Sequence, residues 1–240
     1  MSYVTNFILV VDVALQLALL FFLLRGPSRR YIGLLVYSVA VLVTTAIELV
    51  VTHQAHPDPG LFRRVYWSDE VVVDLLLFLV VISLTNLALE GNPLRAKTSR
   101  ILAGIVAAAL ILPFVLFNPP LFTSPTHWNL AWGRWFNSTS QMLNFGAAIM
   151  NLGLWSALLT SRKRDPQLLK VSIGVGVVVA GQAIGFGIRR FMAEGSTLRE
   201  FPDLFMSLTH VLSVFIWCSA FFSKRPAAAA EDQLQPGSRP

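Results

Sequence analysis

Three acidic residues stand at the head of one of the most apolar stretches of this sequence. Asp69, Glu70 and Asp74 open the segment YWSDEVVVDLLLFLVV, residues 66–81, which continues as valine, leucine and phenylalanine. Glu70 and Asp74 are four residues apart, so a helix would place them on one face. Like charges on one face repel unless a cation lies between them. The spacing therefore predicts either ion pairing with an arginine or the binding of a metal ion or cationic ligand.

A second group of polar side chains follows the helical repeat within residues 130–160. Its members recur every three or four positions, which places them on one stripe of a helix. The stripe consists of Arg134, Asn137, Gln141, Asn144, Ala148 and Asn151. Four side-chain amides on one stripe of a membrane helix should not face lipid. They predict either a lined cavity or hydrogen bonds that join helices.

Shorter polar stripes with the same spacing occur in the first, sixth and last apolar segments. An ionised side chain that faces lipid costs at least about 2.5 kcal/mol on insertion scales, so we expect all the stripes to face a common axis. The predicted ligand-binding residues are Asp12, Glu48, Glu70, Asp74, Arg134, Asn137, Gln141, Asn144, Gln182, Arg189 and His210. The same residues are also consistent with buried ion pairs that fix the register of the helices.

No convincing metal site or catalytic constellation is found in the sequence. His53, His56 and Asp58 have a spacing that suits a divalent metal, but their segment contains prolines and is expected to be a loop, which makes them weak candidates. Motifs such as G-x-S-x-G and H-E-x-x-H are missing, so we expect no enzymatic activity and no cofactor. Retinal is excluded because the last apolar segment has no lysine to form a Schiff base.

The composition predicts which elements position these residues. The chain has 240 residues, of which 55% are hydrophobic and 13% charged, whereas a soluble domain is about a quarter charged. Seven segments are long and apolar enough to cross a bilayer as helices: residues 5–24, 31–52, 68–89, 100–118, 130–160, 167–190 and 201–223. The sequence thus predicts an all-α polytopic membrane protein, with a seven-transmembrane-helix bundle over residues 1–223 and a disordered cytoplasmic tail at 224–240.

The basic residues between these segments predict the orientation. At least twelve lie in the first, third and fifth connections and at the start of the tail, against six on the other side. Since cytoplasmic loops carry the excess of Lys and Arg, we expect the N-terminus outside and the C-terminus in the cytoplasm. Trp67, Trp128, Trp132 and Trp135 lie near the predicted outer ends, where indole rings favour the interface. No basic stretch resembles a nucleic-acid-binding surface, so we expect no nucleic acid partner.

One motif resembles a known group of proteins. The run YWSDEVVVDLLLFLVVISL resembles a motif of uncharacterised bacterial seven-helix inner-membrane proteins, in which a Tyr-Trp pair and a following Glu open the third span; here Tyr66, Trp67 and Glu70 match. The basic loop RGPSRRY is also similar. The resemblance implies the same fold and a multi-pass location in the bacterial inner membrane, but no activity. A fainter similarity relates the chain to the seven-helix sensor regions of bacterial histidine kinases, although it has no kinase domain.

These observations favour a sensor-like or ligand-binding module with a polar pocket in the outer half of the bundle. Such a module would bind a small ligand or ion and act through a separate signalling or membrane protein partner. A small transporter or permease is the alternative, and a purely structural subunit of a membrane complex is another. Against transport, the cytoplasmic halves of the predicted spans contain few polar residues and no internal repeat is visible. In every case the lipid bilayer is a partner.

Overall fold

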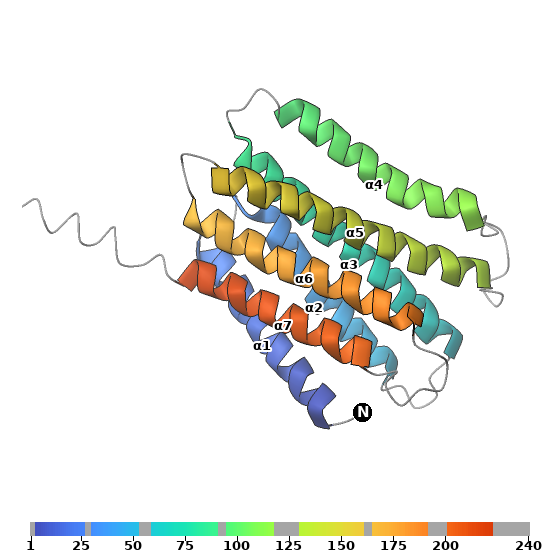
Figure 1. Ribbon diagram of the computed structural model, residues 1–240. Coiled ribbons are helices and arrows are strands. Elements are labelled where there is room, and N and C mark those ends of the chain that lie inside the picture. The colour runs from blue at the N-terminus through green and yellow to red at the C-terminus, as the bar shows by residue number, and fades with distance from the viewer. Residues whose placement is uncertain are drawn as a thin grey trace, which may run out of the picture.

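The chain is described here by a computed structural model, which is helical throughout the residues that it describes. These are residues 3–26, 30–52, 59–90, 95–117, 130–160, 165–191 and 201–222. They form seven long helices (Figure 1): α1 (Tyr3–Arg25), α2 (Ile32–Thr52), α3 (Pro59–Ala88), α4 (Arg95–Phe117), α5 (Leu130–Thr160), α6 (Pro166–Phe191) and α7 (Phe201–Phe222). The predicted all-α bundle is therefore confirmed for this part of the chain, whereas the predicted tail at 224–240 lies outside it.

Six of these helices are long and apolar enough to cross a membrane, and α5 is not among them. The six are α1, α2, α4, α6, α7 and the part of α3 from Val65 to Ala88. This supports a multi-pass membrane protein. The helix that falls short is α5, which carries the stripe of side-chain amides. Its asparagines and glutamine lower its mean hydropathy.

The largest difference from the predicted helix bounds concerns the start of α3. Residues 59–64 were expected to belong to an outer loop, but α3 begins at Pro59. Proline is favoured in the first turn of a helix because its missing N–H would have had no partner there. The apolar part of α3 is therefore preceded by additional helical turns.

Six helices form a ring, and α4 lies beside it. Around the ring α1 contacts α2, α2 contacts α3, α3 contacts α5, α5 contacts α6, α6 contacts α7, and α7 returns to α1. A contact between α3 and α6 crosses the middle. Among the seven described helices, α4 touches α3 and α5 alone, and it lies at the edge of the bundle in Figure 1. An open, mostly apolar cavity of about 270 Å³, lined by Thr85, Leu102 and Met150 among others, lies between α4 and these two neighbours.

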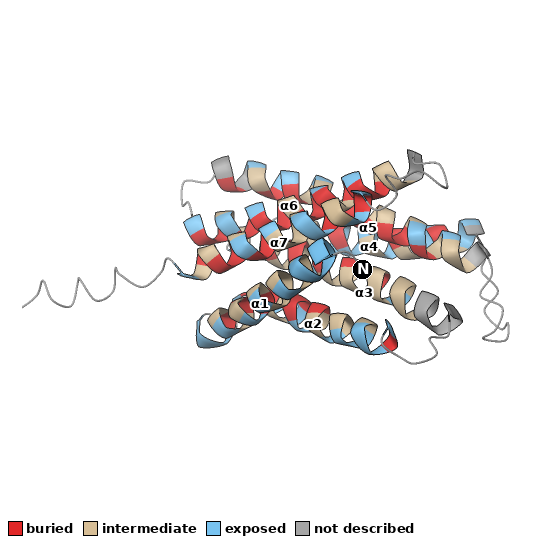
Figure 2. Ribbon diagram, turned by 90° about the horizontal axis from the view of Figure 1, so that it is seen from below, coloured by how far each residue is buried: buried red, intermediate tan, exposed pale blue. Residues whose placement is uncertain are grey.

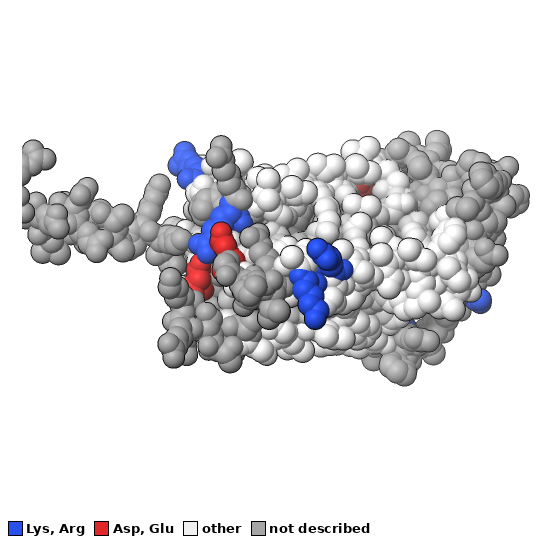
Figure 3. Space-filling model, turned by 90° about the horizontal axis from the view of Figure 1, so that it is seen from above, with Lys and Arg blue, Asp and Glu red and all other residues white. Residues whose placement is uncertain are grey.

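The outer surface of the bundle is apolar. Large aliphatic and aromatic side chains such as Phe7, Val39, Val115 and Phe215 are exposed, and Figure 2 shows exposed residues on the outward faces and buried ones between helices. The face over α4 is largely uncharged, with most of its charged side chains toward one end (Figure 3). Such a surface is unfavourable in water and suits a hydrocarbon environment.

Glycines on one face of α6 allow α7 to pack very closely. A Cβ atom added at Gly181 would overlap Thr209 Oγ1, and one at Gly185 would overlap Met206 Cγ. One at Gly174 would meet the indole of Trp217, whose Nε1–H donates a hydrogen bond to the carbonyl of Val171 at 3.0 Å. These glycines thus serve a contact between two helices of the same chain.

The N-terminus of α6 is capped by an aspartate. The Asp165 carboxylate accepts hydrogen bonds from the backbone N–H groups of Gln167 and Leu168 at 3.0 and 3.1 Å, with Pro166 in the first helical position. It also pairs with Arg30, which precedes α2, at 2.5 Å. Burial alone would raise the pKa of Asp165, but the Leu168 N–H and the Arg30 charge outweigh it and hold that pKa below its usual range.

The close approach of α6 and α7 makes a testable prediction. Gly181→Ala should lower the free energy of unfolding by roughly 1–3 kcal/mol through overpacking, even though alanine favours a helix by about 1 kcal/mol. Gly187→Ala on the same helix is the matched control, because a Cβ there meets no atom within 4 Å. Thermal unfolding of the purified protein in lipid nanodiscs measures both, and equal midpoints for the two variants would contradict the packing described.

The cap at Asp165 predicts a dependence of stability on pH. The pKa of Asp165 is lowered in the folded protein, so this residue stabilises the fold at pH values above its ordinary pKa of about 3.9. The stabilisation is lost as the pH falls through the lower pKa that Asp165 has in the folded protein. Asp165→Asn should therefore be less stable than the parent by about 0.5–1 kcal/mol near neutral pH, and the difference should shrink below pH about 4. Glu90→Gln, which removes an exposed acid, serves as control. A difference that stays constant with pH would refute this.

Candidate functional site

Arg189 connects three helices at one end of the bundle. Its guanidinium donates to Asp203 in the first turn of α7 at 2.5 and 2.8 Å, to Glu70 of α3 at 3.4 Å, and to the hydroxyl oxygen of Tyr66 at 3.2 Å. Its planar fork suits several simultaneous acceptors. This end, at which α1, α3, α5 and α7 begin, is named the Arg189 end below.

Acidic side chains outnumber this arginine in its neighbourhood. Glu48 of α2 lies close enough to Asp69 and Glu70 for their charges to interact, and Glu70 in turn interacts with Asp203. The Glu70 side chain is 19% exposed and that of Asp203 is 60% exposed, so the cluster runs from the bundle interior to its surface. Of the two alternatives predicted for the acids, pairing with an arginine is observed for Glu70.

A histidine–aspartate pair joins the first and last helices deeper in the bundle. His210 Nδ1 lies 3.0 Å from Asp12 Oδ1, and His210 Nε2 lies 3.5 Å from the Gln16 amide nitrogen. If Nδ1 carries the proton and donates to the carboxylate, Nε2 is free to accept from Gln16. The Tyr37 ring of α2 is 6.4 Å from the imidazole. The polar residues Asp12 and Gln16 of α1 therefore meet His210 of α7, as the predicted common axis requires.

A third polar group lies between α3 and α5. The Asp74 side chain approaches the Asn144 amide and the Ser140 hydroxyl, and all three residues are at most 5% exposed. Asp74 Oδ2, Ser140 Oγ and Asn144 Oδ1 nevertheless have no hydrogen bond of standard geometry. Buried polar atoms are nearly always hydrogen-bonded, which makes this the least satisfied polar group among the predicted binding residues.

One polar pair lies toward the opposite end of the bundle. Asn151 of α5 donates to the backbone carbonyl of Ser172 on α6 at 3.2 Å and accepts from its hydroxyl at 3.1 Å. The Asn151 amide thus joins α5 to α6 through hydrogen bonds, which is one of the two roles predicted for the amides of the stripe. The surrounding core is apolar and includes Leu23, Leu34, Val81, Leu154, Leu168 and Val175.

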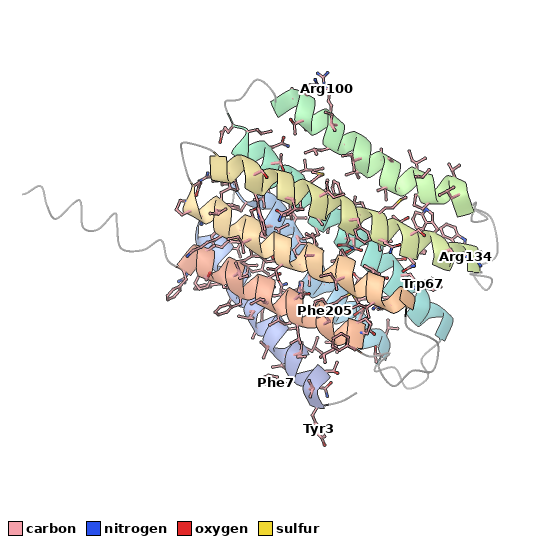
Figure 4. The ribbon with its side chains drawn as sticks, in the orientation of Figure 1. Tyr3, Phe7, Trp67, Arg100, Arg134 and Phe205 are labelled. Atoms are coloured by element: carbon pink, nitrogen blue, oxygen red, sulfur yellow. The ribbon has the colours of Figure 1, made fainter. Side chains whose placement is uncertain are left out.

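The rest of the α5 stripe does not face the interior. Arg134 and Asn137 are exposed, Gln141 is half-buried, and Arg134 lies at the Arg189 end of α5 in Figure 4. A stripe with a spacing near 3.5 residues drifts by roughly 20° every seven residues around a helix of 3.6 residues per turn. Asn144 and Asn151 therefore contact different helices, while the stripe positions in the first turns of α5 face outward. Gln182 of α6 is half-buried.

The weak metal candidates are not tested by this structure. His53, His56 and Asp58 lie outside the described residues, as does Trp128. Within the described ranges, no three residues among His, Cys, Asp and Glu come together in a way that suits a metal ion. The side chain of Arg190, the neighbour of Arg189, is also not described.

Three contributors were missing from the set of predicted binding residues. Asp203 shares a helical stripe with His210 and contacts Arg189, Tyr66 belongs to the Tyr-Trp motif, and Ser140 precedes Asn144 by one helical turn. Spacing alone was a usable signal for Asp203 and Ser140. For Tyr66, the Tyr-Trp motif pointed to the residue but not to the contact of its hydroxyl with Arg189.

A scan against protein-family models and searches of curated proteins and of solved structures found no match to this chain. The resemblance to uncharacterised seven-helix proteins therefore stays a prediction, and the function has to be argued from the geometry of the site.

The arginine cluster makes the third prediction. Arg189→Gln should lower the free energy of unfolding by about 1.5–3 kcal/mol, the range for hydrogen bonds to charged groups, because Glu70 loses its cation. The matched control is Arg134→Gln, an exposed arginine at the same end, which should stay within about 0.5 kcal/mol of the parent. Adding Glu70→Gln to Arg189→Gln should recover part of the loss. Equal losses for the two arginine variants in thermal unfolding would show that the cluster contributes nothing specific.

Proposed function

We propose that this chain is a seven-span protein of the bacterial inner membrane that acts as a sensor-like binding module for a small ligand or ion. The proposal has three parts: all seven helices cross the bilayer, the Arg189 end faces outward, and the polar groups near that end receive the ligand. Output passes to a separate membrane or signalling partner.

The crossing by α5 is supported by its length and its neighbours. Its 31 residues would span about 46 Å at 1.5 Å per residue, which exceeds a hydrocarbon core of about 30 Å. It packs against α3, α4 and α6, and its buried polar residues include Ser140, Asn144 and Asn151. Polar residues in a membrane helix are acceptable when protein covers them.

The proposed orientation is supported by charge and by aromatic side chains. Basic residues at the end opposite Arg189 include Arg25, Arg30, Lys97 and Lys170, in agreement with a cytoplasmic side rich in lysine and arginine. At the Arg189 end, aromatic rings of α3 and α5 gather, with the Trp67 and Phe136 centroids 6.1 Å apart and those of Trp135 and Phe136 4.7 Å apart. Aromatic rings of this kind favour the membrane interface.

The observation that carries the proposed binding function is the incompletely satisfied polar group of Asp74, Ser140 and Asn144. A purely structural cluster would be expected to satisfy its own hydrogen bonds, as Asn151 and Ser172 do. Toward the opposite end the core is mostly apolar and the Asn151–Ser172 pair satisfies its own hydrogen bonds, which favours a site reached from one side over a continuous path for transport.

Binding can be tested with the full-length protein in nanodiscs. Sodium, calcium and methylammonium chlorides are compared with choline chloride at equal ionic strength, and at least one should raise the unfolding midpoint by several degrees. Glu70→Gln or Asp74→Asn should fold but lose that rise, whereas the exposed control Glu90→Gln should keep it.

Two results would redirect the proposal. If no salt stabilises the parent and the acid variants merely lower its midpoint, the cluster is structural and a binding function is wrong. If the stabilising cation is taken up by proteoliposomes containing the protein, a transporter replaces the binding module.

A further inference from the structure

The pair of Asp12 and His210 ties the first helix of the bundle to the last. His210 Nδ1 lies 3.0 Å from Asp12 Oδ1, and the two side chains are 14% and 15% exposed. Within the described ranges α1 packs against α7 and α2 alone, and Figure 1 shows α1 beside α7. A change in this pair therefore acts on one of the two contacts that hold α1 in the bundle.

Both ring nitrogens of His210 have a polar neighbour. Nδ1 faces the Asp12 carboxylate, and since an ionised carboxylate only accepts hydrogen bonds, Nδ1 carries the hydrogen. Nε2 lies 3.5 Å from the side-chain nitrogen of Gln16, which is fully buried. The other end of the amide, Gln16 Oε1, is buried and has no hydrogen-bond partner. The imidazole is thus held between a fixed acceptor and an amide of which one end is in use.

The Gln16 amide can serve either charge state of the imidazole. When His210 is neutral, Nε2 is an acceptor and the amide nitrogen donates to it. When His210 takes a second proton, Nε2 becomes a donor, and turning the amide end for end brings Oε1 to the place of the nitrogen. Oε1 then gains the partner that it lacks. Each charge state therefore has a donor opposite an acceptor at both ring nitrogens.

The second proton also removes the net charge of the pair. An ionised Asp12 beside a neutral imidazole carries one uncompensated negative charge, whereas the same carboxylate beside an imidazolium forms a neutral ion pair. An unpaired charge is costly where solvation is poor. Histidine exchanges its proton between about pH 5 and 8, and two ionisable groups in contact titrate as one unit. Proton uptake is therefore chemically suited to this position.

The charges around the pair do not replace that proton. The nearest titratable and charged groups on the surrounding helices are Tyr37 of α2, Asp69 and Asp74 of α3, Arg189 of α6, and Asp203 and Cys218 of α7. Arg189, the cation of this set, is engaged by Asp203 and Glu70. The proton on His210 is thus the counter-charge left for the Asp12 carboxylate.

We propose that His210 and Asp12 form a proton-binding site that controls the contact between α1 and α7. The ligand is a hydrogen ion from water, which adds to Nε2 of His210, turns the Gln16 amide and completes the ion pair with Asp12. Its release leaves a carboxylate beside a neutral ring and weakens the contact. This site goes beyond the proposed binding of a ligand near Asp74, because it needs no ligand there.

Nitrogen-15 NMR of the full-length protein in nanodiscs tests the proton site directly. Replacing the other three histidines, by His53→Gln, His56→Gln and His127→Gln, leaves His210 as the single imidazole. At pH 8 the hydrogen should be on Nδ1 alone, and at pH 5 both ring nitrogens should carry one. Asp12→Asn should move this transition to lower pH. Gln16→Met should move it in the same direction, which keeps the test informative if Asp12→Asn does not fold.

Control of the helix contact is read from Cys218, the single cysteine of the chain. It is buried at the same interface, where its thiol donates to the Leu15 carbonyl at 3.5 Å. Its rate of reaction with N-ethylmaleimide is compared between His210→Gln and the parent at each pH, so that the effect of pH on the thiol itself cancels. The variant should react several-fold faster at pH 5, and the ratio should approach one at pH 8. The variant without the other three histidines is the matched control and should react like the parent.

The outcomes separate this inference from the broader proposal. His210 signals that do not change between pH 5 and 8, a transition that Asp12→Asn leaves in place, or a labelling ratio that does not vary with pH each overturn the proton site. None of these measurements adds a salt or other ligand. If they fail while a cation still stabilises the parent through Glu70 or Asp74, the binding module stands and the proton site alone falls.

Discussion

The absence of water inside a bilayer is the constraint on which this structure depends. Hydrocarbon offers no hydrogen bonds, so each polar side chain within the bundle must find its partner in the protein itself. The helices are arranged accordingly. Arg189 joins α6 to α3 and α7, His210 joins α7 to α1, and Asn151 joins α5 to α6. The polar contacts thus connect most members of the ring. The exposed apolar faces alone would not determine which helices are neighbours.

The two ends of the bundle are stabilised in different ways. Near Arg189, stability comes from charge pairs that run from the interior to the surface. Toward the opposite end it comes from close packing, such as the insertion of Trp217 against Gly174 with its indole bonded to the Val171 carbonyl. Charge pairs respond to pH and salt, while packed apolar groups do so only weakly. Solution conditions should therefore act mainly on the Arg189 end and, at the opposite end, on the Asp165–Arg30 pair.

The sequence predicted the helices well and their partners poorly, for physical reasons. Hydrophobic length and helical spacing determine which residues share a face, so α1, α2 and α7 and the inward position of Asp74 could be expected. Which helix each face meets depends on packing in three dimensions, so the pairing of Asp12 with His210 and of Asn151 with Ser172 could not. Arg134 and Asn137 were expected inside because the drift of the stripe was neglected. Hydropathy also ranks α5 below the other six helices, since it counts polar atoms whether or not other helices cover them.

The aspartate–histidine pair between the first and last helices has a consequence for biosynthesis. Asp12 and His210 are separated by 198 residues, and a ribosome adds about 5–20 residues per second. The acid therefore enters the membrane roughly 10–40 s before its partner has been made, by the same elongation rate. During that interval Asp12 lacks the His210 side chain and has to be solvated near the headgroups or beside a translocation factor. Completion of the ring is consequently the last step of assembly, and a chain truncated before α7 would leave an orphaned acid for quality control to detect.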